Sequence, residues 1–328
     1  MKKHLIAATL ASLAIASHAI ASHAAELKTE QFTGSVLTEG LDAPWDMQWG
    51  ADDQLWLTER QGKRITRVNP QNGEKQTVIT LDEVHTGPQH EGLLGFTFSP
   101  AFAQDHYLYT AYTYMDGNHE HTKIIRLTYD PNNHTAGAPH TIIDKLPAGT
   151  DHNAGRLRFG PDGKLYYTIG ELGHNQGKHR YEPIEAQRLP SQQELDAKDY
   201  SAYVGKTLRL EADGSIPADN PQINGVRSHV YTYGHRNPQG LVFVDDKPYS
   251  VEHGPNSDDE INLLQPGGNY GWSHVAGYRD NQAYEYTNYS LSKTRPENGE
   301  PTDVKPEKET DWTAPMNEPL KIFHTVNN

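Results

Sequence analysis

One pattern of short apolar and polar segments occurs four times along the chain. Each copy begins with an apolar segment, followed by a turn rich in Pro, Asp and Gly, a segment rich in Tyr, Trp and Thr, and a segment of the type Ile-x-Arg. Short alternating segments separated by turn residues are typical of antiparallel strands. A β-sandwich would also contain short strands, but it would not repeat the same succession four times. The recurrence predicts an all-β fold, a β-propeller of four-stranded antiparallel blades.

The predicted strands are defined by the three segments of each copy. The first segments are Trp45–Trp49, Leu94–Phe98, Leu157–Phe159 and Leu241–Phe243. The second segments are Leu55–Thr58, Tyr107–Thr110, Leu165–Thr168 and Pro248–Val251. The third segments are Arg64–Val68, Lys123–Leu127, Lys206–Leu210 and Glu260–Leu263. Pro319–Phe323 is predicted to be the last strand of the fourth region, and we expect about four blades plus part of a fifth in this chain.

The intervals between copies grow along the chain because residues are inserted in the later copies. In propellers, long loops gather on one face and build the site there. The insertion Glu171–Tyr203 contains Pro190-Ser191-Gln192-Gln193-Glu194, a capping box that predicts a short helix. A second insertion, Thr294–Thr310, is rich in Pro, Glu and Lys and is predicted to be an exposed excursion.

The first 24 residues have the pattern of an export signal. Lys2 and Lys3 precede a mostly apolar, Ala-rich run, and small residues at Ser22 and Ala24 allow cleavage after Ala24. The apolar run is too short to span a membrane. We therefore expect a signal peptide at 1–24, a single propeller domain at 25–328, and a periplasmic or secreted protein without a membrane span.

Composition excludes several classes of function. The 328 residues include 29 Lys and Arg against 43 Asp and Glu, a formal charge of −14, which argues against nucleic acid as a partner. Because the sequence contains no Cys, disulfides, thiol nucleophiles and Cys-ligated metals are excluded. Neither a Gly-rich phosphate loop nor a Gly-x-Ser-x-Gly elbow is present, which disfavours NAD and serine-hydrolase chemistry.

Candidate catalytic residues lie directly before the third and fourth copies. Asp151 and His152 could form a general base whose tautomer is set by the carboxylate. Arg236 and Asn237 could hold a carboxylate or quinone oxygen by charge-assisted hydrogen bonds, but the commoner role of such a pair is to fix a loop by bonding backbone carbonyls. The residues by themselves leave both alternatives open.

Two further polar segments could bind metal. The acidic turn Glu252–Glu260 places oxygen ligands on a Gly-Pro turn, which favours Ca²⁺, although a solvated acidic loop would have the same composition. His119-Glu120-His121 could suit a transition metal, but we expect it to be a solvated loop between strands.

A set of longer strings resembles the soluble quinoprotein glucose dehydrogenases. They run in the family's order over about residues 33–325 and comprise Leu55–Arg60, Gly92–Phe96, Asp151–His152, Tyr166–Gly170, Gly234–Gly240, Gly254–Leu263 and Gly267–Trp272. The resemblance implies a six-bladed propeller that binds pyrroloquinoline quinone (PQQ) and Ca²⁺ and oxidises aldose sugars to lactones. It also implies a soluble or membrane electron acceptor and a possible homodimer.

Residue by residue, the resemblance assigns roles around the quinone. His152 matches the base that takes the proton from the sugar C1 hydroxyl, and Asp151 would orient that imidazole. Arg236 and Asn237 match residues that contact the quinone, the Arg stabilising negative charge on its oxygen. The cofactor-side positions of the family are occupied by Gln89, His90 and Glu171.

The resemblance also implies two calcium sites. The carbonyls of Gly254 and Pro255 match the ligands of the catalytic Ca²⁺, a Lewis acid beside the quinone. A second, structural site near the family's dimer contact is matched by Glu260, Tyr270, Ala276, Asp280 and Glu309.

The sequence departs from the family at the sugar pocket. His90, preceded by Gln89, stands where the family has a Gln, Glu171 replaces an Asp, and Gly177 replaces a Leu. These changes predict an enlarged or re-aimed pocket. The family also continues for roughly a quarter of its length beyond residue 328, so we expect a C-terminally incomplete propeller. A Ca²⁺-dependent propeller hydrolase such as a lactonase, and a non-catalytic sugar-binding propeller, are the alternative functions.

Overall fold

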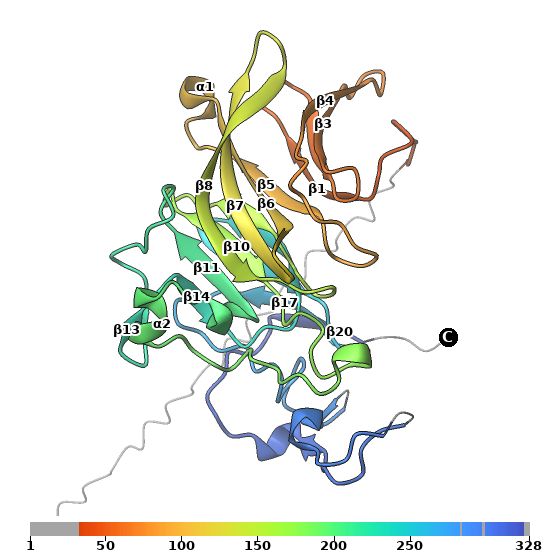
Figure 1. Cartoon of the computed structure of the whole chain (residues 1–328), viewed down its shortest axis with the longest axis vertical. Helices are drawn as coiled ribbons and strands as arrows, with labels where there is room; N and C mark the ends of the chain where they lie inside the picture. Colours follow the sequence, from red (N-terminus) through yellow and green to blue (C-terminus); the bar gives the residue numbers. More distant parts are fainter. Residues whose placement is uncertain (1–32, 283, 297–298, 325–328) are drawn as a thin grey trace, which may run out of the picture. The chain divides into compact units, whose positions relative to one another are not determined.

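Four four-stranded antiparallel sheets follow one another along the chain in the computed structural model, which describes residues 33–282, 284–296 and 299–324 (Figure 1). Blade 1 consists of β1 Pro44–Trp49, β2 Leu55–Glu59, β3 Arg64–Val68 and β4 Lys75–Thr80. Blade 2 consists of β5 Leu93–Phe98, β6 Tyr107–Asp116, β7 His119–Asp130 and β8 Thr135–Pro147. Blade 3 consists of β9 Leu157–Phe159, β10 Leu165–Ile169, β11 Lys206–Leu210 and β14 Val230–Tyr233. Blade 4 consists of β15 Pro238–Val244, β16 Lys247–Glu252, β17 Asp259–Leu263 and β20 Lys321–Phe323.

The remaining elements lie in the insertions. Two small hairpins are formed by β12 Gln222–Ile223 with β13 Val226–Arg227, and by β18 Glu285–Tyr286 with β19 Glu307–Lys308. The helices are α1 Phe102–Asp105 and α2 Gln192–Asp196. Single 3₁₀ turns are η1 Gly177–His179, η2 Ser201–Tyr203, η3 Tyr289–Leu291 and η4 Glu309–Asp311. None of the helices in the described part of the chain has the length and apolar character needed to cross a bilayer.

The repeat correctly predicts the first three strands of every blade. Each predicted segment lies within a strand, and the propeller prediction is confirmed. The capping box is confirmed as well, because Ser191 Oγ accepts from Glu194 N at 3.3 Å and Glu194 Oε2 accepts from Ser191 N at 2.8 Å. Residues 1–24, the predicted signal peptide, lie outside the described residues.

The prediction that Pro319–Phe323 holds the last strand of the fourth region is confirmed, because β20 pairs with β17 and completes blade 4, with Glu260 opposite Ile322. Two other predictions are wrong, namely part of a fifth blade and a loop at His119–His121. No part of a fifth four-stranded blade occurs in residues 33–282, 284–296 or 299–324. His119–His121 is not a loop, because it begins β7 and pairs with β6, His121 lying opposite Tyr114.

The hydrophobic core lies between neighbouring blades. Trp56, Ile65 and Phe96 belong to a cluster that joins blades 1 and 2. A second cluster, which includes Tyr167, joins blades 2 and 3, and a third, which includes Tyr166, joins blades 3 and 4. Each blade is therefore held by apolar burial against its neighbours, which is the dominant favourable contribution to folding.

A buried ion pair links the first strands of blades 1 and 3. Asp46 on β1 is 3% exposed and accepts hydrogen bonds from Arg158 on β9, at 2.8 Å from Nη1 and 2.9 Å from Nη2. Asp46 also accepts from Phe96 N on β5 at 3.2 Å, and Arg156 forms a second ion pair with it. Bidentate charged hydrogen bonds of this kind fix geometry as well as charge.

Antiparallel pairing decides where the site forms. In each blade, the first residues of the first strand lie beside the last residues of the second strand, at the same end of the sheet. The same end of the sheets therefore carries the residues before β9 and β15 and the residues after β10 and β16. These residues include most of the candidates named above.

Candidate functional site

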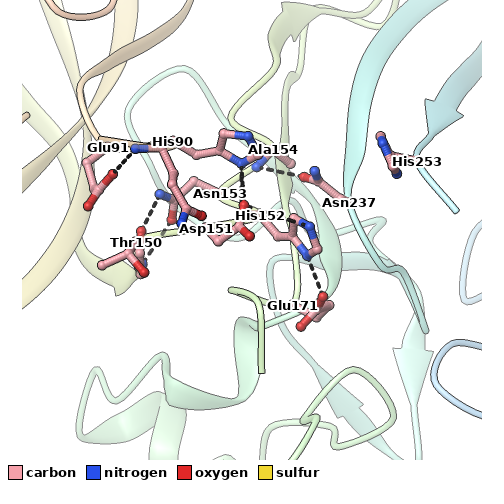
Figure 2. Close-up of polar contacts among 12 residues, drawn as sticks. His90, Glu91, Thr150, Asp151, His152, Asn153, Ala154, Glu171, Asn237 and His253 are labelled. Carbon is pink, nitrogen blue, oxygen red and sulfur yellow. Dashed lines mark hydrogen bonds and ion pairs between the residues drawn. The ribbon is translucent and has the colours of Figure 1, made fainter. Parts of the chain in front are cut away.

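The centre of the site is a buried pair formed by His152 and Glu171 (Figure 2). His152 lies in the loop before β9, and Glu171 follows β10 directly. His152 Nδ1 is 2.5 Å from Glu171 Oε1, and the two residues are 7% and 1% exposed. A proton on Nδ1 shared with this carboxylate leaves Nε2 as the basic nitrogen. Within the described residues, Nε2 has no hydrogen-bond partner, and its nearest ion-pair atom is Asp151 Oδ1 at 3.8 Å.

The loop that carries His152 has an unusual backbone that is held in place by asparagines. His152 and Ala154 have φ values of +45° and +49°, a left-handed backbone conformation that residues other than Gly rarely adopt. Asn153 Oδ1 accepts from Gly149 N at 3.0 Å, and Asn237 Oδ1 accepts from Ala154 N at 3.2 Å. Such strain persists only where surrounding contacts enforce it.

Gly170 lets the end of β10 approach this loop. A Cβ atom at Gly170 would lie 1.9 Å from the carbonyl oxygen of His152 and 3.1 Å from that of Arg236. Glu171 N, the next residue, donates to Arg236 O at 2.7 Å. The close packing at Gly170 therefore brings His152, Glu171 and Arg236 together.

The predicted role of Asp151 needs correction. Asp151 Oδ1 accepts from the backbone N of His152 at 2.8 Å and lies 3.0 Å from His90 Nδ1. The carboxylate that contacts the ring nitrogen of His152 is that of Glu171, so Glu171 orients the imidazole. The partner of Nδ1 is not the neighbour in sequence, because the β9–β10 hairpin brings Glu171 back to the ring.

Arg236 is a buried cation beside this pair. It is 5% exposed, and its Nη1 donates to His253 O at 3.0 Å. Its guanidinium lies 5.5 Å from the ring centre of Trp272. Burial lowers the pKa of Arg236, and the nearby carboxylates of Glu171 and Glu252 oppose that shift.

Two neighbouring cavities border these residues. One has a volume of about 230 Å³, and its walls include Glu171, Gln176, Arg236, Pro255, Trp272 and Tyr284. The other has a volume of about 310 Å³, and its walls include Gln89, Asp151, His152, Gln176 and Gly177. Gln176 borders both cavities, so they are adjacent. His152 borders one of them, and Arg236 borders the other.

The cavity beside Arg236 contains buried polar atoms that need a partner. Glu171 Oε2, Arg236 Nε and Trp272 Nε1 are buried and make no hydrogen bond. A buried polar atom without a partner costs about 1–3 kcal/mol. Two donors and one acceptor around one cavity suit a flat ligand that carries oxygen and nitrogen atoms, such as a quinone.

The other predicted cofactor residues are placed less directly. Asn237 is 1% exposed and staples the His152 loop through Ala154 N, the alternative that the residue pattern had left open. Gln89 borders the cavity of His152, and His90 contacts Asp151 and the backbone of His152. Contacts between these three residues and a quinone remain predictions.

The predicted catalytic calcium ligands lie at the edge of the Arg236 cavity. Pro255 borders that cavity, and Gly254 O accepts from His253 Nδ1 at 2.6 Å in one ring tautomer. Gly254 is required here because a Cβ atom would lie 1.9 Å from Ser257 O. Backbone carbonyl oxygens are ligands that Ca²⁺ accepts in proteins.

The predicted structural calcium residues are only partly gathered. Glu260 Oε1 accepts from Gly277 N at 2.7 Å, and Glu309 accepts from Ala276 N at 3.0 Å. Burial raises the pKa of Glu260 to about 8, and burial with nearby Asp280 raises that of Glu309. The hydroxyl of Tyr270 instead donates to Leu263 O at 2.6 Å.

Side chains alone do not form a metal site in the part of the chain that the structure describes. No group of three or more His, Cys, Asp and Glu residues there is arranged to hold an ion. Asp258 Oδ2 and Asn262 Oδ1 are nevertheless buried without a partner, and Asn262 Nδ2 donates to Glu260 Oε2 at 2.7 Å. Unpartnered oxygens beside Glu260 fit a hard cation that also uses backbone carbonyls.

Sequence reasoning missed two residues that border the site. Gln176, in the insertion after β10, borders both cavities, and Trp272 packs against Arg236. Trp272 ends the string Gly267–Trp272 that contributed to the resemblance, so its position was noticed without a role. Gln176 carries no motif and could not have been singled out.

Comparison with known proteins gives consistent matches over most of the chain. The family model described as glucose / sorbosone dehydrogenase matches residues 41–305. Quinoprotein glucose dehydrogenase B of Acinetobacter calcoaceticus is 45% identical over 320 residues, which cover 93% of this chain and 67% of that protein. Aldose sugar dehydrogenase YliI of Escherichia coli is 31% identical, over 72% of this chain and 60% of that protein.

A solved structure supports the same relationship. The PQQ-bound aldose sugar dehydrogenase of Streptomyces coelicolor matches with a TM-score of 0.63 and 33% identity, over 74% of this chain and 66% of that one. The chain thus spans about two thirds of the length of these relatives. On the family model and the identity to its curated relatives, the chain belongs to the glucose/sorbosone dehydrogenase family.

Proposed function

We propose that the protein oxidises aldose sugars to lactones with PQQ as the electron acceptor and Ca²⁺ beside it. The observation that carries the proposal is the His152–Glu171 pair, whose Nε2 has no hydrogen-bond partner among the described residues, next to the cavity of Arg236. Family membership and the names of the relatives support the same chemistry.

In this proposal His152 is the general base. Its Nε2 takes the proton from the anomeric hydroxyl of a sugar bound in the cavity of about 310 Å³ that His152 borders. Glu171 keeps the proton of Nδ1 in place and stabilises the imidazolium that forms when Nε2 is protonated. Asp151, on the same wall, accepts a hydrogen bond from a sugar hydroxyl.

The cofactor would be held in the cavity of about 230 Å³. Trp272 would offer a flat apolar surface, and the unpartnered Arg236 Nε would donate to an oxygen of the ligand. Gly254 and Pro255 would supply carbonyl oxygens to Ca²⁺. PQQ supplies a two-electron acceptor when bound, with Ca²⁺ acting as a Lewis acid beside it. Arg236 stabilises negative charge that develops in this cavity.

Location and partners complete the proposal. The pattern of residues 1–24 supports export to the periplasm or beyond. The electrons would then pass to a soluble or membrane acceptor, and the residues around Glu260 and Glu309 would bind a second calcium near a homodimer contact.

The test is reconstitution of the chain with PQQ and CaCl₂, followed by measurement of sugar-dependent dye reduction. We expect turnover, and we expect His152→Asn to lower kcat about 10³-fold because the base is lost. An absorbance titration with PQQ is the control, because quinone affinity should not depend on this nitrogen. Absence of sugar-dependent reduction, or equal rates for the two proteins, would contradict the proposed function.

A further inference from the structure

A cavity of about 470 Å³ lies between blades 3 and 4, away from the candidate site. Its walls include Asp162, in the turn after β9, and Asp246, in the turn between β15 and β16. These turns lie at the end of the sheets opposite to the loops that carry His152 and Arg236. The cavity shares no wall residue with the two cavities of the candidate site, so it is a separate place for a ligand.

Three aromatic rings form an apolar part of the wall. Tyr231 and Phe243 pack edge-on against Tyr166, with ring centres 5.3 and 5.0 Å from that of Tyr166. Three prolines, which carry no N–H group, also border the cavity. Walls of this kind cannot replace the hydration shell of a small inorganic ion, so they favour a ligand with an apolar body.

The guanidinium in this wall is not available to a ligand. Nη1 and Nη2 of Arg209 donate to the two carboxylate oxygens of Asp219 at 2.8 and 2.9 Å. Nε donates to Asp162 Oδ2 at 3.0 Å, Nη2 lies 2.9 Å from the same oxygen, and Nη1 also donates to Asn220 Oδ1 at 2.8 Å. The Arg209 contact lowers the pKa of Asp219 to about 2, so this carboxylate stays ionised. An anionic ligand would find no free N–H on Arg209.

Asp246 adds a carboxylate that has no counter-charge. It lies in the two-residue turn between β15 and β16, where Asp245 and Asp246 have φ values of +46° and +63°. No hydrogen bond or ion pair joins the Asp246 side chain to another residue in the part of the chain that the structure describes. Three carboxylates and one guanidinium therefore border the cavity, and its wall carries a net negative charge.

We propose that this cavity binds a small organic cation, an alkylammonium group with an apolar body. An ammonium whose charge is spread over alkyl groups is attracted to aromatic rings as well as to carboxylates. Tyr231 and Phe243 contact its alkyl groups, and the Asp246 carboxylate neutralises its charge. The binding site lies outside the site proposed for sugar oxidation and does not depend on that activity.

The first experiment compares choline with its neutral isostere 3,3-dimethylbutan-1-ol by isothermal titration of the full chain without quinone. We expect saturable binding of choline, about 10-fold tighter than that of the alcohol, because the two molecules differ in charge but hardly in shape. The affinity for choline should also fall as the salt concentration rises. Equal affinities for the two molecules, or no saturable binding of choline, would overturn the proposal.

The second experiment locates the site with three substitutions. Asp246→Asn should weaken choline binding about 5-fold, whereas Asp245→Asn should leave it within about twofold, because Asp245 belongs to the same turn but does not border the cavity. Phe243→Leu keeps an apolar side chain but removes the ring, so it should weaken the binding of choline about 5-fold and that of the alcohol much less.

Equal effects of the two Asp→Asn substitutions, or unchanged choline affinity in Phe243→Leu, would contradict the proposal. None of the substituted residues borders the candidate site, so sugar oxidation should continue at its usual rate in all three variants. If the unmodified protein does not oxidise sugar, the proposed function fails, and the choline titrations still decide whether this cavity binds a cation.

Discussion

Two His–Glu pairs occupy neighbouring blades of this protein, and their surroundings differ in one respect. His152 pairs with Glu171 before and after the first hairpin of blade 3, and His235 pairs with Glu252 in the corresponding part of blade 4. His235 Nδ1 lies 2.8 Å from Glu252 Oε2, and its Nε2 lies 2.7 Å from Thr232 Oγ1. Its ring is fully buried and stacks on Tyr270 with centres 4.7 Å apart.

The difference lies in the second ring nitrogen. His235 has partners on both nitrogens, Thr232 on β14 of blade 3 and Glu252 on β16 of blade 4, so it joins these two blades. His152 has a carboxylate on Nδ1, while its Nε2 is left without a hydrogen bond and its ring borders a cavity. The carboxylate partner is therefore common to both histidines, and the unpartnered Nε2 is the feature that supports the proposal of His152 as the base.

The largest effect is expected when the orienting carboxylate of blade 3 is neutralised. In the reconstituted enzyme, Glu171→Gln should lower kcat about 10³-fold, equivalent to about 4 kcal/mol, because the imidazolium of His152 loses its counter-charge. The free energy of unfolding, measured by urea titration, should change little. Normal turnover in this variant would show that Glu171 does not support a base.

A smaller effect is expected for His235, and it concerns the free energy of unfolding instead of kcat. His235→Ala removes the imidazole that contacts both the buried Glu252 carboxylate and the Thr232 hydroxyl, at a cost of about 3 kcal/mol in the free energy of unfolding. Among the described residues, Glu252 then keeps only the contact with Arg236 N, and Thr232 keeps only that with Thr207 Oγ1. The double variant with Glu252→Gln should lose less than the sum of the single losses. If the two losses simply add, the pair is not coupled as the structure indicates.

The smallest effect concerns His229, which has no carboxylate partner. Its Nδ1 lies 2.9 Å from Tyr203 Oη and its Nε2 lies 3.0 Å from Gly214 O, and burial lowers its pKa to about 4. The unfolded chain binds a proton below about pH 6.5, whereas the folded protein does not bind one until about pH 4. Stability from this group is therefore present above pH 6.5 and is lost as the pH falls toward 4.

For His229, urea titrations at two pH values provide the measurement. Between pH 7 and pH 5.5 its contribution to the free energy of unfolding should fall by about 1 kcal/mol. His229→Gln cannot titrate and should lack this part of the pH dependence. An identical pH dependence in both proteins would show that the pKa of His229 is the same in the folded and the unfolded protein.

The strands of the repeat could be predicted because their apolar residues are buried between blades. The outer strands β4 and β8 could not be predicted, because they lie at blade edges, where only part of each strand is buried and the alternation is weak. His119–His121 is polar enough to suggest a loop, but the β6–β7 hairpin extends through it by backbone pairing.

The sequence analysis named most residues of the candidate site but not the contacts between them. His152, Arg236 and Glu171 were all named from the sequence, yet His152 was paired with the adjacent Asp151. Glu171 is 19 residues away in sequence and reaches His152 only because β9 and β10 form a hairpin. A pairing that depends on the return of the chain has no signature in the local sequence.

The ion pair between Asp46 and Arg158 has a consequence for the order of folding. The two residues are 112 positions apart, and all of blade 2 lies between them in the chain. Contacts between residues so far apart in sequence require a long loop to close, so we expect this ion pair to form late in folding. In a chain folded only as far as blade 2, the carboxylate of Asp46 would lack its partner Arg158. Once β9 has packed, the ion pair holds blade 3 against blade 1.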